Sequence, residues 1–141
     1  MLIKNVMENS DNDKDILIIN GIITDSQNNL NHLEEIISIK RFNSETKEYI
    51  LCQIDYFNLI IFYHKKLKEI QGKLSYEYIK IMKMILQKIK NKLEYILSNN
   101  FNPKNIEYEY EKSISVFKNH DGYYDEQIAI FETLNNEIIS Q

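Results

Sequence analysis

Histidine and cysteine are the residue types of this chain that could catalyse a reaction or hold a metal. The three histidines, His32, His64 and His120, lie far apart, and none belongs to a His-x-x-x-His or Glu-x-x-His motif, the spacings that bring two ligands to one helical face. The only cysteine, Cys52, lies in an apolar segment, where a thiol is usually an unreactive core residue. We therefore expect no metal, no cofactor and no enzymatic activity.

An acidic run near the N-terminus begins like a calcium-binding EF-hand loop. Its first three ligand positions are occupied by Asp11, Asp13 and Asp15. The match then fails, because Ile16 stands where the loop requires glycine and Ile22 where it requires glutamate. We expect residues 1–14 to form a flexible acidic arm before a single domain over residues 15–141.

The charge of the chain, −4 in total, is unevenly distributed. Residues 1–40 carry three lysines against seven acids, residues 41–100 eleven basic residues against six acids, and residues 101–141 three lysines against eight acids. One interpretation is that the acidic ends pack beside the basic middle and neutralise it. The alternative is a basic surface that binds a polyanion such as nucleic acid.

The candidate nucleic-acid-binding residues are the lysines on the polar face of a predicted central helix, Lys80, Lys83 and Lys90. Two features disfavour this alternative. Arg41 is the only arginine of the chain, and arginine is the side chain that most often reads bases. No aromatic residues are clearly interleaved with the lysines for base stacking.

The acidic C-terminal third contains a cluster of tyrosines, which suits a protein-binding surface because tyrosine buries a large area at low entropic cost. The candidate partner-binding residues are Glu107, Tyr108, Glu109, Tyr110, Glu111, Tyr123 and Tyr124. Such a surface would suit a partner with a basic surface. The competing interpretation is that about half of these rings belong to the core.

The elements that must position these residues are predicted to be helices. Three glycines and one proline in 141 residues are too few for the tight turns of an all-β domain. Apolar residues at helical spacing predict helices over residues 45–71 and 76–98, with Ser75 as the N-cap of the second. Because residues 48–63 are also rich in aromatic and β-branched side chains, a strand there is the alternative.

Two other segments also leave the choice between helix and strand open. Asn102-Pro103 predicts the start of a helix that continues through Phe117, although Ile106, Tyr108 and Tyr110 also alternate as in a strand. In residues 15–24, Asn20-Gly21 between apolar runs predicts a β-hairpin, with a short broken helix as the alternative. Shorter apolar stripes predict helices over residues 30–41 and from residue 124 to residue 138.

These elements predict an all-α bundle of about four to five helices in two antiparallel hairpins, with an α+β fold as the alternative. We expect a small non-enzymatic protein that binds and modulates another macromolecule, as an inhibitor, adaptor or immunity factor does. No apolar run approaches the length of a membrane span, and the single cysteine fits the cytoplasm. The abundance of Lys, Asn and Ile is typical of AT-rich genomes, including those of some phages and viruses. The oligomeric state stays open, with a homodimer among the alternatives.

Overall fold

The computed structural model describes residues 13–70 and 75–139. In this part of the chain all regular structure is helical, and no strand occurs. The elements are α2 (Asp13–Ile39), α3 (Ser44–Glu69), α4 (Tyr76–Ile96), the 3₁₀ turn η1 (Pro103–Asn105), α5 (Tyr110–Lys118) and α6 (Tyr123–Ile139). The predicted all-α bundle is confirmed, and the α+β alternative is not supported.

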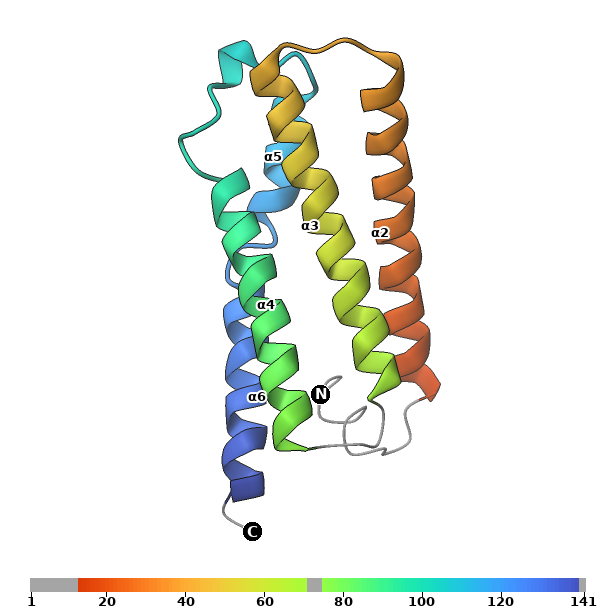
Figure 1. Cartoon of the computed structure of the whole chain (residues 1–141), viewed down its shortest axis with the longest axis vertical. Coiled ribbons are helices and arrows are strands. Elements are labelled where there is room, and N and C mark those ends of the chain that lie inside the picture. The colour runs from red at the N-terminus through yellow and green to blue at the C-terminus, as the bar shows by residue number, and fades with distance from the viewer. Residues whose placement is uncertain (1–12, 71–74, 140–141) are drawn as a thin grey trace.

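The long helices alternate in direction along the chain (Figure 1). α3 packs between α2 and α4, and α4 packs in turn against α6. The α3–α4 pair is the first of the two predicted hairpins. α5 and α6 do not form the second, because they make no extensive contact with each other and follow one another along the same side of the bundle (Figure 1). α2 packs extensively on α3 but makes no comparable contact with α5 or α6.

The β-hairpin predicted around Asn20-Gly21 is wrong, because α2 runs through both residues without a break. Tertiary packing overrides the local turn signal here. Ile19 is fully buried against the rest of the core, and Asn20 Oδ1 accepts a hydrogen bond of 2.7 Å from Lys68 Nζ on α3. The expected helix over residues 30–41 is therefore the C-terminal part of one 27-residue helix, which ends at Ile39. Residues 1–12, most of the expected acidic arm, lie outside the described residues.

Side-chain caps fix the starts of the two central helices. Asn43 Oδ1 accepts the backbone N–H of Thr46 at 2.7 Å, and Ser75 Oγ accepts that of Tyr78 at 3.3 Å. Each cap satisfies an N–H group that the helix itself cannot pair. The prediction of Ser75 as an N-cap is confirmed. The sequence also predicts Gly72 as the residue that follows the end of the helix over residues 45–71, but Gly72 lies outside the described residues. α4 buries the apolar stripe that its spacing predicts, from Met82 to Ile96.

The helix predicted from Pro103 through Phe117 is split in two. Asn102 caps only the 3₁₀ turn η1, and residues 106–109 are not helical before α5 begins at Tyr110. Tertiary hydrogen bonds hold this intervening segment. The backbone N–H of Glu107 donates to Thr46 Oγ1 at 2.9 Å, and the Glu107 carboxylate accepts the N–H of Asn43 at 2.9 Å. These bonds to the start of α3 replace the intrahelical bonds that a continuous helix would have formed.

Candidate functional site

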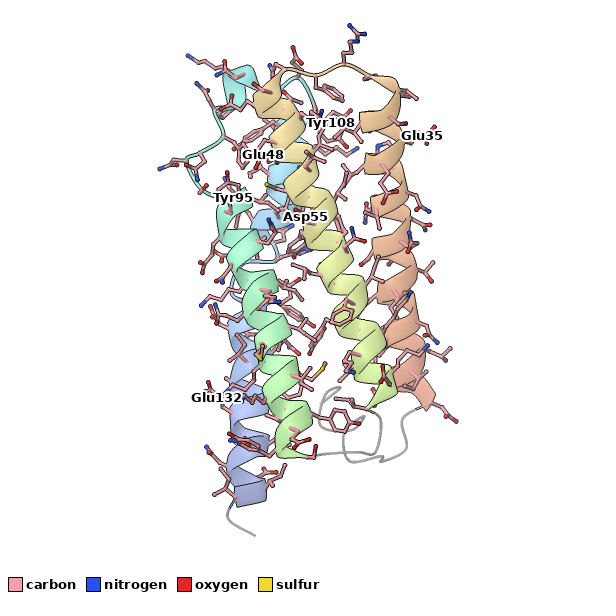
Figure 2. All side chains as sticks on the ribbon, in the orientation of Figure 1. Glu35, Glu48, Asp55, Tyr95, Tyr108 and Glu132 are labelled. Carbon is pink, nitrogen blue, oxygen red and sulfur yellow. The ribbon has the colours of Figure 1, made fainter. Side chains whose placement is uncertain are left out.

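A groove runs along the side of the bundle between α2 and residues 107–124, since α5 and α6 make no extensive contact with α2. It consists of three hollows. The first, here called the histidine cavity because His64 and His120 line it, has a volume of about 370 Å³ and lies between α2, α3 and the start of α6. The middle hollow (about 210 Å³) lies beside α5, and the upper hollow (about 420 Å³) lies beside residues 107–109. Glu35 and Tyr108, labelled in Figure 2, lie at the upper end.

Neighbouring hollows adjoin one another, because they share lining residues. The histidine cavity and the middle hollow share Asn29, Phe57 and Val116, and the middle and upper hollows share His32, Tyr108 and Glu109. α2 forms one wall, α3 the floor, and residues 107–124 the other wall. α2 lines the groove from Ile22 to Ile39, so at about 1.5 Å of rise per residue the groove is about 25 Å long.

The groove combines an apolar interior with an acidic margin. Phe57 and Ile60 of α3 are buried beneath it, and Val116 of α5 is 47% exposed along its wall. Its charged lining residues are four carboxylates, Asp25, Glu35, Glu107 and Glu109, against two lysines, Lys40 and Lys112. Lys112 is paired with Glu109 at 3.8 Å. The surplus of carboxylates makes the margin net negative.

Five of the seven residues predicted to contact a partner line this groove: Glu107, Tyr108, Glu109, Tyr123 and Tyr124. The other two do not. Tyr110 is half-buried with its ring centroid 5.2 Å from that of Tyr49, and Glu111 is exposed outside the groove lining. Tyr124 is itself 5% exposed, so at most the edge of its ring is available. That the remaining residues contact a partner stays a prediction.

The histidine cavity contains two buried polar side chains that no sequence motif marks as a site. Ser26 of α2 is 6% exposed and His64 of α3 is 4% exposed, and both line the cavity. His64 Nδ1 lies 2.8 Å from the carbonyl oxygen of Ile60, which makes Nδ1–H the donor. Burial lowers the pKa of His64, although this hydrogen bond opposes the shift. The ring is therefore neutral at pH 7, with Nε2 as an acceptor.

A hydrogen-bonded network lies beside this cavity. Tyr56 of α3 is fully buried, and its hydroxyl lies 2.7 Å from His120 Nδ1 and 2.7 Å from the hydroxyl of Tyr124. Burial raises the pKa of Tyr56 and of Tyr124 and lowers the pKa of His120. All three side chains are neutral at pH 7, so the network joins α3 to α6 without a buried charge.

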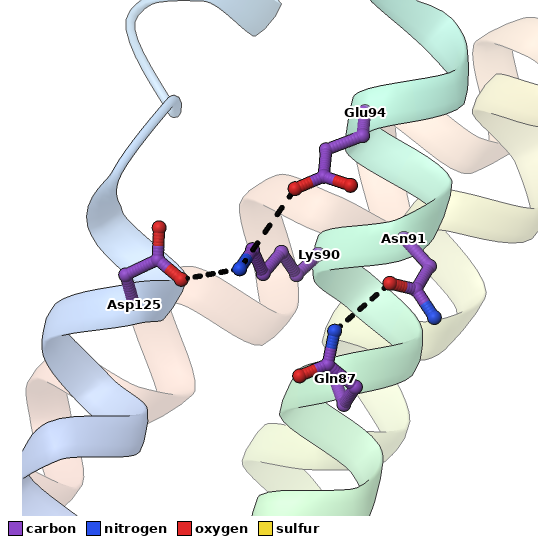
Figure 3. A network of polar contacts seen from close by, with 5 residues as sticks. All are labelled: Gln87, Lys90, Asn91, Glu94 and Asp125. Atoms are coloured by element: carbon purple, nitrogen blue, oxygen red, sulfur yellow. Dashed lines mark hydrogen bonds and ion pairs between the residues drawn. The ribbon is translucent and has the colours of Figure 1, made fainter.

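The lysines proposed to contact nucleic acid are largely engaged within the bundle. Lys90 Nζ lies 2.7 Å from Asp125 on α6 and 3.8 Å from Glu94 (Figure 3), and Lys83 lies 3.6 Å from Glu132 on α6. The carboxylate of Asp125 raises the pKa of Lys90. Lys80 has no ion pair with a described residue. This pairing agrees with the interpretation that the acidic C-terminal third neutralises the basic middle.

Metal binding and nucleophilic catalysis gain no support in the described residues. No group of three or more His, Cys, Asp or Glu side chains there could hold a metal ion. Cys52 is buried, and its Sγ lies 3.6 Å from a Glu48 carboxylate oxygen. Burial, followed by the charge of Glu48, raises the pKa of Cys52 to about 11. The thiol is therefore protonated at neutral pH, which is the unreactive form.

Among residues 13–70 and 75–139, none of the helices has both the length and the apolar character needed to cross a membrane. Comparison of the whole chain with protein families, curated proteins and solved structures gives no match.

Proposed function

We propose that this protein binds another protein by holding a helix of that partner in the groove. We propose further that it modulates the partner as an inhibitor, adaptor or immunity factor would. The observation that carries the proposal is the groove itself. Three adjoining hollows follow α2 for about 25 Å, and none of the described helices covers them. A helix of about 17 residues has this length, and an amphipathic helix laid in an apolar groove is a common mode of recognition.

The charge of the groove defines the partner helix further. Carboxylates lie on both walls, with Asp25 and Glu35 on α2 and Glu107 and Glu109 opposite. A helix with an apolar stripe flanked by Lys or Arg would bury its stripe against Phe57 and Val116 and place its charges near these carboxylates. Complementary charges of this kind mainly accelerate association and exclude acidic competitors. We place the interaction in the reducing cytoplasm, which suits the free Cys52.

Nucleic-acid binding through Lys80, Lys83 and Lys90 is the weaker candidate. Two of these lysines are already paired with carboxylates of α6, and a phosphate would have to displace these carboxylates. Electrostatic binding to a phosphate backbone depends on the number of lysines available to it. The pairing therefore lowers the affinity that this face can provide.

A display selection tests the proposed function. A library of 20-residue peptides is selected against the full chain, and enriched peptides are retested on two variants of α5. Val116→Trp places a large ring in the groove at the junction of two hollows, whereas Ser115→Trp adds the same ring at an exposed position that does not line the groove. We expect basic amphipathic helices that lose at least tenfold in affinity on Val116→Trp and retain it on Ser115→Trp.

Two outcomes would contradict the proposed function. One is that no peptide of this type is enriched. The other is that enriched peptides bind the two tryptophan variants equally well, which would place their site outside the groove. If the chain instead captures nucleic acid, and Lys80→Glu abolishes the capture, the alternative function replaces the proposed one.

A further inference from the structure

The histidine cavity has the composition of a ligand site. Its volume of about 370 Å³ is at the lower end of the range for small-molecule pockets. Apolar and aromatic side chains from four helices form most of its wall: Ile22, Phe57, Ile60, Val116, Tyr123 and Tyr124. A flat ring inserted among these side chains would remove apolar surface from water on both of its faces.

Two polar atoms in this wall have unused hydrogen-bonding capacity. Ser26 Oγ and His64 Nε2 form no hydrogen bond with another described residue, although both side chains are more than nine-tenths buried. They come from different helices, α2 and α3, and line the same cavity. Neither atom is among the fully enclosed unpaired side-chain atoms of the described residues, so both are accessible from the cavity, where water or a ligand can complete their hydrogen bonding.

The hydrogen bonds already present determine what this molecule must offer. His64 uses Nδ1–H as a donor to Ile60, so the Nε2 of the neutral ring can only accept. The hydroxyl of Ser26 can donate or accept. The charged group that lines the cavity is Asp25, which is exposed at the margin of α2. A charged ligand group would lose its hydration at the buried end without gaining a counter-charge there.

We propose that the histidine cavity binds an uncharged aromatic ring that carries one N–H or O–H donor, such as an indole or a phenol, with the donor directed at His64 Nε2. The ring can belong to a free small molecule or to a tryptophan or tyrosine side chain of a bound protein. The inference does not depend on the proposed function, because the cavity can be tested with a ligand too small to fill the groove.

The test compares three ligands on the full chain. Indole offers an N–H donor, 3-methylindole keeps this donor while adding a methyl group, and 1-methylindole replaces the donor by a methyl group. Binding is followed by NMR of the ¹⁵N-labelled histidine rings. We expect saturable shifts at His64 with indole and 3-methylindole. We expect 1-methylindole to bind about tenfold more weakly, because one hydrogen bond is lost.

A variant identifies the acceptor. His64→Phe keeps a ring of similar size but removes Nε2, so it should bind all three ligands with similar affinity. Because this variant has no His64 signal, its binding is followed at His120, which also lines the cavity. Tyr95→Phe, at a partly exposed position of α4 that lines none of the three hollows, should preserve the discrimination. Absence of saturable shifts at His64, or equal affinity of the unaltered chain for indole and 1-methylindole, would overturn the inference. The ligand comparison decides the matter even if His64→Phe does not fold.

The source of the ring is decided by affinity. Micromolar binding of free indole indicates a small-molecule ligand. Millimolar binding of free indole, together with micromolar binding of a selected peptide that loses its affinity on Trp→Ala, indicates the side chain of a partner. Both results support a binding site for an aromatic ring in the histidine cavity. Both differ from the result that would contradict the proposed function, which is that the groove binds no helix.

Discussion

The hydroxyl of Tyr56 lies 2.7 Å from the hydroxyl of Tyr124, which joins the middle of α3 to the first turn of α6. The same Tyr56 hydroxyl lies 2.7 Å from His120 Nδ1. Since α5 and α6 make no extensive contact with α2, these bonds help to hold the wall of the groove that contains His120 and Tyr123. A polar contact in the core thus maintains the geometry of the proposed site.

We expect Tyr56→Phe to lower the free energy of unfolding by about 1–3 kcal/mol, because it leaves His120 Nδ1 and the Tyr124 hydroxyl without their shared partner. Denaturant unfolding followed by circular dichroism would measure the change. Tyr95→Phe is the matched control, since Tyr95 is 39% exposed and its hydroxyl has no hydrogen bond to a described residue. Equal stability of the two variants would show that the network contributes little.

The contact between Thr46 and Glu107 gives a second prediction. Thr46 is fully buried, and its Oγ1 accepts the N–H of Glu107 at 2.9 Å and donates to the carbonyl of Asn105 at 3.2 Å. Thr46→Val keeps the shape but removes both bonds, so we expect a loss of about 1–3 kcal/mol in stability. Hydrogen exchange at the Glu107 amide should also become faster.

Thr24→Val is the control for this substitution, because Thr24 lies on an exposed face of α2. Unchanged exchange at Glu107 in the Thr46 variant would mean that segment 106–109 is held by other contacts, such as the burial of Ile106.

The same contact explains why the single helix predicted over residues 103–117 is interrupted in the structure. Asn102-Pro103 is a sound start signal, and it does start η1. The turn does not continue, because Thr46 and Asn43, about 60 residues earlier in the chain, pair with the backbone and side chain of Glu107. Local propensity contains no information about such a partner. By contrast, α4 was predicted closely because its stripe, its cap and its length are all local features.

The groove could be predicted only in part for a related reason. The acidic and tyrosine residues of one wall stand together in the sequence and were identified. The opposite wall is a row of α2 residues at helical spacing, Ile22, Asp25, Ser26, Asn29, His32 and Ile36. The sequence predicts a hairpin over residues 15–24 and a helix over residues 30–41, which leaves Asp25, Ser26 and Asn29 in neither element. The common face of the row was therefore not recognised. The floor residue His64 carries no sequence signal, since its role arises from burial.

The buried histidines predict that stability falls on acidification. Burial lowers the pKa of His64 and of His120 below the ordinary value of 6.5, so below about pH 6.5 the unfolded chain binds more protons than the folded one. The free energy of unfolding therefore decreases as the pH falls from 7.5 to 5.5. The other titratable side chains that line the cavity with His64 are Asp25, His120, Tyr123 and Tyr124.

Denaturation curves across this pH range would measure the effect. His64→Phe should reduce the pH dependence, because one of the two titrating groups is removed. His32→Phe, on the exposed surface of α2, should leave it unchanged. The same slope in both variants would show that the decrease comes from other groups.

The buried thiol predicts slow chemical modification. Burial and the Glu48 carboxylate raise the pKa of Cys52 from 9.0 to about 11, so its thiolate fraction at pH 8 is about 100-fold lower than that of an ordinary cysteine. We expect Ellman's reagent to modify the folded chain at least 100-fold more slowly than the chain in guanidinium chloride. Rapid modification under native conditions would mean that α3 opens locally around Cys52.

Charge reversal on the two walls tests the proposed electrostatic attraction between groove and partner. Asp25→Lys with Glu109→Lys changes one exposed carboxylate on each wall, while Glu111→Lys with Asp121→Lys makes the same change in net charge at exposed positions outside the groove. The first pair should slow association of a basic helical peptide, and the effect should grow at low ionic strength, where screening is weak. The control pair has the same effect on overall charge but does not change the charge beside the groove. Stopped-flow association rates at two salt concentrations separate the two effects, and equal rates for the two double variants would place the contact surface elsewhere.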